Sequence, residues 1–364
     1  RELFRQLSVF VGGFTLDALE SVAQLDSNRS VLHVLSRLVD KSLVIVEQRD
    51  NVRYQLLETI RQYAGEKLQE SGNARWSHDR HLAYFLMYAE KAEPHIFSAE
   101  QRVWTNRLEI EHDNLRAALR WSLESDQAKA GLQMTGALAW FWHNNGHLRE
   151  GSRWLEKMLI SDHGVPGTER AKALRVSSMI SRYMGDYIRA EALADSSIKL
   201  YREIGDNQGV GLALIGLGAI LHLEGKQEEA IESFEESLRL LRATGERWGI
   251  AYALVWLGDT WFRMGDIERA ATSWEESLPI TQELGDDYLM GWSLGGLADV
   301  ARLRADYKRA TGMFKESLSL YQSSGNKFGP PFSMEALGLV AVALGDAKRA
   351  ARLWGAASAW REAI

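Results

Sequence analysis

The residues whose spacing most resembles a site for chemistry are two histidine pairs. His143 and His147 stand four residues apart, as do metal-binding histidines on a helix, and His78 and His81 flank Asp79. The first pair straddles Asn144-Asn145-Gly146, which should break a helix, and no carboxylate-histidine motif completes either pair. The sequence therefore predicts no metal site.

Motifs for catalysis are absent from the sequence. It contains no G-x-x-x-x-G-K-[ST] loop, no G-x-S-x-G, no H-E-x-x-H and no dinucleotide-binding fingerprint. The lack of cysteine removes thiol nucleophiles and disulfides, and fits a reducing cytoplasm. We therefore expect a chain that is not an enzyme, has no catalytic residues and carries no cofactor of its own.

Charge and hydropathy exclude two further classes of partner. The net charge of -6 argues against a surface dominated by phosphate binding, so nucleic acid is not the expected partner. No apolar run approaches the length that spans a bilayer. We expect a cytoplasmic protein without a membrane partner.

The elements that must position any site follow a period of forty residues. Gly185, Gly225, Gly265 and Gly345 share one phase, in which Ala305 takes the remaining slot. Apolar residues in each half-period have helical spacing, which predicts stacked helical hairpins. An aromatic residue stands four positions after an alanine that recurs at the same position of each repeat. The arrangement resembles the tetratricopeptide repeat in a long variant. These aromatic residues, expected to fill the space between hairpins, are Phe234, Trp274, Phe314 and Trp354.

The first 72 residues have a different pattern. Three helices, one capped by Thr15 and one by Ser30, precede two strands around a turn at Arg49-Asp50-Asn51, which is the order of a winged helix. The third helix, Ser30-Asp40, offers only His33 and Arg37 for reading DNA bases. We therefore expect this domain to serve structural coupling in preference to DNA contact.

Two segments carry a more specific resemblance. Residues 38–44 (LVDKSLV) and 54–64 (YQLLETIRQYA) resemble the winged-helix part of the STAND ATPases, which join a nucleotide-binding switch to a repeat sensor. In relatives the second segment holds a Met-His-Asp motif, and Leu57 and Glu58 occupy its last two positions here. The resemblance implies that Leu57, Glu58 and Arg61 couple the domain to that switch. For Glu58, a carboxylate favoured by the helix dipole is the plainer alternative.

The same resemblance implies partners outside this sequence. An ATPase domain that binds ATP or ADP and Mg is expected before Arg1, and activation would bring homo-oligomerisation. The predicted class is a mostly α chain with a winged helix followed by an α-solenoid. Its expected parts are a winged helix at 1–72, a helical linker at 73–130, and a superhelix at 131–364 with a degenerate first repeat (131–169), regular repeats (170–209, 210–249, 250–289, 290–329) and a partial one (330–364).

The candidate binding surface is the concave wall formed by the first helix of each hairpin. Aromatic residues interleaved with both signs of charge suit a partner with apolar and polar groups. The candidates are Arg182, His222, Tyr252, Trp256, Asp259, Arg263, Trp292, Asp299 and Arg302. For Trp256, packing between adjacent hairpins is an equally open alternative.

These patterns predict the sensor and coupling portion of a bacterial STAND-type transcriptional regulator. A protein, peptide or small-molecule inducer would bind in the groove and bias the ATPase through its different affinity for two states. The alternative is a constitutive scaffold or self-association module.

Overall fold

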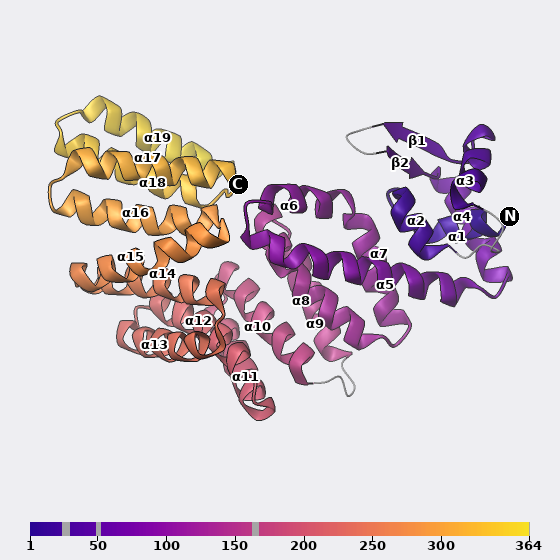
Figure 1. The fold of residues 1–364 in the computed structure, drawn as a ribbon, viewed down its shortest axis with the longest axis horizontal. Coiled ribbons are helices and arrows are strands. Elements are labelled where there is room, and N and C mark those ends of the chain that lie inside the picture. Colours follow the sequence, from indigo (N-terminus) through magenta and orange to yellow (C-terminus); the bar gives the residue numbers. More distant parts are fainter. Residues whose placement is uncertain (24–29, 49–51, 162–166, 364) are drawn as a thin grey trace. The chain divides into compact units, whose positions relative to one another are not determined.

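The computed structural model describes residues 1–23, 30–48, 52–161 and 167–363. The chain is mostly helical and forms two compact units (Figure 1). The first comprises Arg1–Ala92, Asn106–Leu138 and Trp154–Val165, and the second comprises Glu93–Thr105, Ala139–Arg153 and Pro166–Ile364. The described helices include none with the length and apolar character needed to cross a bilayer.

The first unit begins with a winged helix, as predicted. Thr15 caps a helix by accepting a hydrogen bond from the Ala18 amide at 3.2 Å, whereas Ser30 occupies its N-cap position without such a bond. Two antiparallel strands pair Ile45 with Gln55, and the predicted turn between them lies outside the described residues. The elements are α1 (Glu2–Gln6), η1 (Leu7–Val9), α2 (Leu16–Val22), α3 (Val31–Asp40), β1 (Ile45–Gln48), β2 (Val52–Gln55) and α4 (Glu58–Glu70).

Six further helical segments precede the regular array. The helix predicted to break at Asn144-Asn145-Gly146 ends at Asn145, which confirms that prediction. The segments are α5 (Ala74–Ala92), η2 (Glu93–Phe97), α6 (Gln101–Ile110), α7 (His112–Glu124), α8 (Ala128–Asn145) and α9 (Leu148–Ile160).

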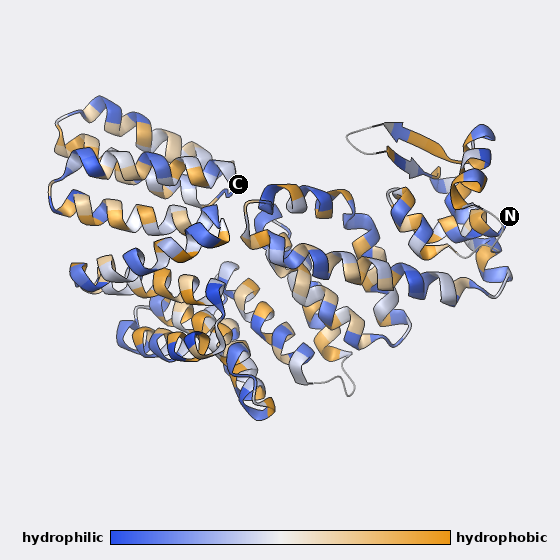
Figure 2. Cartoon of the chain, viewed as in Figure 1, coloured by the Kyte–Doolittle hydropathy of each residue, from blue (hydrophilic) through white to orange (hydrophobic). Residues whose placement is uncertain are grey.

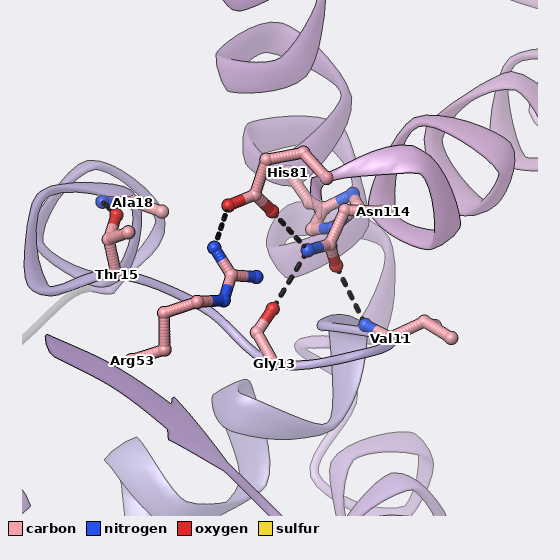
Figure 3. A network of polar contacts seen from close by, with 8 residues as sticks. Val11, Gly13, Thr15, Ala18, Arg53, His81 and Asn114 are labelled. Carbon is pink, nitrogen blue, oxygen red and sulfur yellow. Dashed lines mark hydrogen bonds and ion pairs between the residues drawn. The ribbon is translucent and has the colours of Figure 1, made fainter. Parts of the chain in front are cut away.

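A buried amide ties the wing to α5 and α7 (Figure 3). Asn114 donates to the carbonyl of Gly13 at 2.8 Å and to Glu111 at 2.7 Å, and accepts from the Val11 amide at 2.7 Å. Glu111 in turn pairs with Arg53 of β2. Because buried polar groups are costly unless they are bonded, this network fixes the wing and the preceding loop in one arrangement.

The array consists of helices of similar length joined by tight turns. At Gly205 the backbone has φ 75°, a left-handed conformation that glycine adopts without a Cβ clash, and Asp206 then accepts from the Gly209 amide at 2.8 Å. The helices are α10 (Gly167–Tyr183), α11 (Tyr187–Ile204), α12 (Asn207–Glu224), α13 (Gln227–Thr244), α14 (Arg247–Met264), α15 (Ile267–Leu284), α16 (Asp287–Leu303), α17 (Tyr307–Ser323), α18 (Gly329–Ala343) and α19 (Ala347–Glu362).

Small residues let each hairpin close, as predicted. A Cβ added at Gly218 of α12 would lie 2.6 Å from the ring of Phe234 on α13, and one at Gly258 would lie 2.5 Å from Trp274. Phe234 and Phe314 are buried, whereas Trp354, in the hairpin of α18 and α19, is 41% exposed. Apolar and polar residues are mixed along every helix of the array (Figure 2).

The order of helix contacts defines a wall made of the first helices. Each second helix packs against the first helix of the next hairpin, and successive first helices α10, α12, α14, α16 and α18 also pack against one another. The first helices therefore form one continuous wall of the second unit. Residues at corresponding positions on them come together although they are forty apart in sequence.

Candidate functional site

An aromatic cluster lies on the wall of first helices. Trp256 of α14 meets Trp292 of α16 with ring centroids 4.9 Å apart, and meets His222 of α12 at 5.5 Å. Tyr252, one turn earlier on α14, meets Trp292 at 6.5 Å. Trp256 is only 6% exposed. Packing between hairpins, the alternative considered for Trp256, is therefore part of what this residue does.

Two tryptophan–aspartate pairs cross between α14 and α16. The indole N–H of Trp292 donates to Asp259 at 2.9 Å, and that of Trp248 donates to Asp286 at 3.0 Å. Burial, with a smaller contribution from the charge of Asp299, raises the pKa of Asp259 to about 7. Burial likewise raises the pKa of Asp286 to about 6. Two carboxyl groups of this wall therefore change charge near neutral pH.

His222 joins the cluster to the end of α12. Its Nδ1 lies 2.9 Å from the hydroxyl of Thr260, and its carbonyl accepts from Arg263 at 3.1 Å. Burial, and next the charge of Arg263, lowers the pKa of His222 to about 4, so the imidazole is neutral at pH 7. Arg263 is exposed, and its role at this point is to cap the helix.

Asp299 and Arg302 form an ion pair on α16 with a nitrogen–oxygen distance of 2.7 Å. Burial raises the pKa of Asp299, and the hydrogen bond from Arg302 opposes that shift. The charge of Asp299 also acts on Asp259, which links this pair to the aromatic cluster. The pair offers both signs of charge at the margin of the cluster.

A pocket adjoins the cluster and is almost filled by the chain itself. The space left in it, about 10 Å³, is close to what one water needs. Ile96 and Phe97 of η2 form part of its lining, and Phe97 packs against Trp248 at 4.4 Å and Trp140 at 5.5 Å. The other lining residues are Gln101, Trp140, His143, Asn144, Trp248, Asp286, Tyr288 and Asn326.

A salt bridge holds the other end of this short segment. Glu93, the first residue of η2, pairs with Lys172 of α10 at 2.7 Å. Ala99, just beyond η2, lies beside Gly285, because a Cβ built on that glycine would be in van der Waals contact with it at 3.5 Å. Residues 93–97, which we call the covering segment, thus lie on the repeat helices as a short bound peptide would.

The structure brings six of the nine groove candidates into one cluster and places the other three at its margin. The cluster contains Arg182, His222, Tyr252, Trp256, Asp259 and Trp292, and the margin holds Arg263, Asp299 and Arg302. Trp248 and Tyr288 were not among the candidates, although each precedes one by four residues and so shares its helix face. The positions of Trp140 and Phe97 do not follow the forty-residue repeat, so the repeat pattern could not identify these two residues as part of the site.

The three coupling candidates lie at the start of α4 in the first unit. Leu57 is 52% exposed, and Glu58 accepts from Arg61 at 2.9 and 2.7 Å. Hydrogen bonds from Arg61 and then Gln62 lower the pKa of Glu58. Their role in coupling stays a prediction.

Comparison with known proteins agrees with this architecture. A winged helix-turn-helix domain matches residues 1–69, and tetratricopeptide repeats match residues 169–243 and 249–323. A Mycobacterium tuberculosis protein named "putative HTH-type transcriptional regulator" is 38% identical over 231 residues, which are 59% of this chain and 26% of that protein. The aligned part thus spans about a quarter of this relative.

Solved structures show the same fold at low identity. A STAND protein with a tetratricopeptide repeat sensor from Pyrococcus horikoshii aligns with TM-score 0.55 at 16% identity, over 96% of this chain and 55% of that one. NprR in complex with its cognate peptide NprX aligns with TM-score 0.51 at 13% identity, over 62% and 65%. The chain is therefore a winged helix followed by tetratricopeptide repeats, without a recognised catalytic domain.

Proposed function

We propose that this chain is the sensor and coupling portion of a transcriptional regulator of the STAND type, and that its groove binds a short peptide inducer. The covering segment carries the proposal. A piece of polypeptide, anchored by Glu93 and with Phe97 inserted among Trp140 and Trp248, already occupies the aromatic wall. A wall that holds this segment has the shape and chemistry to hold another like it.

Competition with the covering segment would turn binding into a signal. The segment follows α5 directly and leads into α6, and the first unit comprises both α5 and the end of α6 from Asn106 onward. A peptide that takes its place would release the covering segment. The release would change the conformational constraint that the chain places on the winged helix. The inducer would then shift the equilibrium only by its preference for the uncovered state.

Two of the similar proteins support this reading. The relative from Mycobacterium tuberculosis is named as a regulator, and NprR was solved with a peptide bound. An upstream ATPase switch, with ATP or ADP and Mg, is part of the proposal because of the resemblance to STAND proteins. Leu57, Glu58 and Arg61 are the proposed contacts with that switch.

Peptide retention tests the groove directly. The immobilised 364-residue chain is exposed to a random pentapeptide library, and retained peptides are identified by mass spectrometry. Trp248→Ala removes a ring that contacts Phe97, Tyr252 and Asp286, so retention should fall at least about tenfold. Trp360→Ala, at the far end of the array on α19, is the matched control and should retain the same peptides.

The competing function is a constitutive scaffold that associates with itself. Light scattering over a concentration series separates the two functions. A mass that rises with concentration in the absence of peptide, together with equal retention by Trp248→Ala and the native chain, would favour the scaffold.

A further inference from the structure

Arg182 is a buried cation without an acidic partner. It lies in the last turn of α10 and is 6% exposed. Its guanidinium carbon lies 4.2 Å from the ring centre of Tyr183 and 5.4 Å from that of Trp256. Among the described residues, no carboxylate forms an ion pair with it. A hydrogen bond joins its side chain to that of Tyr183, whereas its Nε has no hydrogen-bond partner.

Such a side chain is costly to keep. Arginine stays protonated at every physiological pH, and a buried charge destabilises a fold unless an opposite charge or several hydrogen bonds compensate it. The aromatic faces attract the cation, and the Tyr183 side chain hydrogen-bonds to it, but neither neutralises its charge as an anion would. Folding alone does not explain the position of this residue.

Arg182 also acts on the pocket. Burial, with a smaller contribution from the charge of Arg182, lowers the pKa of His143, which lines the pocket, to about 4. His143 is therefore neutral at pH 7 and adds no second positive charge beside Arg182. Asp259 and Asp286, two carboxyl groups of the same wall, each accept an indole N–H.

We infer that Arg182 is the receptor for a carboxylate of the peptide that occupies the groove, an inference that rests on the proposed function. The guanidinium fork matches a carboxylate in two parallel hydrogen bonds, and low water content strengthens that pairing. The covering segment leaves this position unused, because its only carboxylate within residues 93–97, that of Glu93, pairs with Lys172. An inducer would therefore gain an interaction that the covering segment does not make.

Three defined pentapeptide libraries distinguish the possible sources of the carboxylate. One lacks Asp and Glu and has a free C-terminus, one contains Asp and Glu and is amidated, and one lacks both kinds of carboxylate. The first two libraries carry a carboxylate and are called acidic; the third carries none and is called neutral. The full chain should retain at least one acidic library about tenfold more than the neutral library. Whichever acidic library is preferred identifies the terminal or the side-chain carboxylate.

Arg182→Met is the decisive variant. Replacing a buried unpaired charge with an apolar side chain of similar length should leave the melting temperature unchanged or raise it, while the preference for acidic libraries disappears. Arg182→Lys, which keeps the charge without the fork, should retain part of the preference. If Arg182→Met does not fold, Arg182→Gln provides the same comparison.

The outcomes separate this inference from the proposed function. Equal retention of acidic and neutral libraries by the native chain, lost in Trp248→Ala, would overturn the role of Arg182 and leave the groove assignment standing. An acidic preference that survives in Arg182→Met or Arg182→Gln would also overturn it. Retention of no library would overturn both.

Discussion

The indole N–H of Trp292 donates to the carboxyl group of Asp259 across 2.9 Å, from one first helix of the array to the next. This bond places an acid inside an aromatic cluster, where burial raises its pKa to about 7. The two residues were both candidates from the repeat register, and their direct pairing explains why a carboxylate tolerates this position.

Asp259→Asn should alter the pH dependence of stability. The folded chain holds the Asp259 proton up to about pH 7, whereas the unfolded chain releases it near 3.8, so the native protein loses stability as pH rises between these values. The variant keeps an acceptor for Trp292 and lacks this loss. Its free energy of unfolding relative to that of the native chain should therefore rise from pH 4 to pH 8, by an amount on the order of 1 kcal/mol or more, and its melting temperature should rise with it.

Thermal scans of both proteins at pH 4, 5, 6, 7 and 8 give the difference curve. The pKa of Asp286 is raised in the same direction, but that group is present in both proteins and cancels. A difference that stays flat across this range would contradict the raised pKa of Asp259.

Asn114→Ala should weaken the first unit. The change leaves the Val11 amide, the Gly13 carbonyl and one oxygen of Glu111 without their common partner. Because these buried groups lose their hydrogen-bond partners, the free energy of unfolding should fall by about 2–4 kcal/mol in total. Amide hydrogen exchange in α5 and α7 should accelerate, while exchange in α12 to α15 stays as in the native chain. Asn106→Ala, exposed on α6, is the control and should leave all of these rates unchanged.

Ala305→Gly should stabilise the array. Ala305 has φ 60°, and glycine occupies the equivalent slot at Gly225, Gly265 and Gly345, with φ of 86°, 83° and 78°. Relief of the Cβ clash is worth about 1–2 kcal/mol, and the greater freedom of glycine in the unfolded chain offsets part of it. The net gain should be about 0.5–1 kcal/mol in urea unfolding. Gly265→Ala should lower the free energy of unfolding by a similar amount. A lower free energy of unfolding in both variants would contradict this explanation.

The repeat register explains how much of the site the sequence could predict. Tyr252 and Trp292 are forty residues apart and meet because successive first helices pack together. Any residue on the same face follows by the same rule, so Trp248 and Tyr288 were within reach of sequence reasoning. Arg182 was predicted by register as well, but its lack of an acidic partner depends on every neighbouring helix.

Two parts of the molecule lay beyond such reasoning. Phe97 reaches Trp248 from a short 3-10 helix about 150 residues earlier, and no periodicity relates them. The Asn114 network joins single polar residues from a loop, a strand and two helices.

Phe97→Ala should loosen the covering segment and improve peptide binding. The variant removes the ring that packs against Trp140 and Trp248, while Glu93 still pairs with Lys172. If the inducer must displace this ring, the uncovered state becomes more populated and the apparent dissociation constant falls, about tenfold for each 1.4 kcal/mol of lost packing. Because the ring is partly buried, the melting temperature should fall at the same time.

Titration of the native chain and the variant with one retained pentapeptide, followed by calorimetry, measures this change. Phe332→Ala is the matched control, because that ring on α18 is 66% exposed and takes no part in the pocket. It should leave the dissociation constant unchanged. Weaker binding in Phe97→Ala would mean that the ring belongs to the peptide site as a contact, and the covering segment would then assist the inducer instead of competing with it.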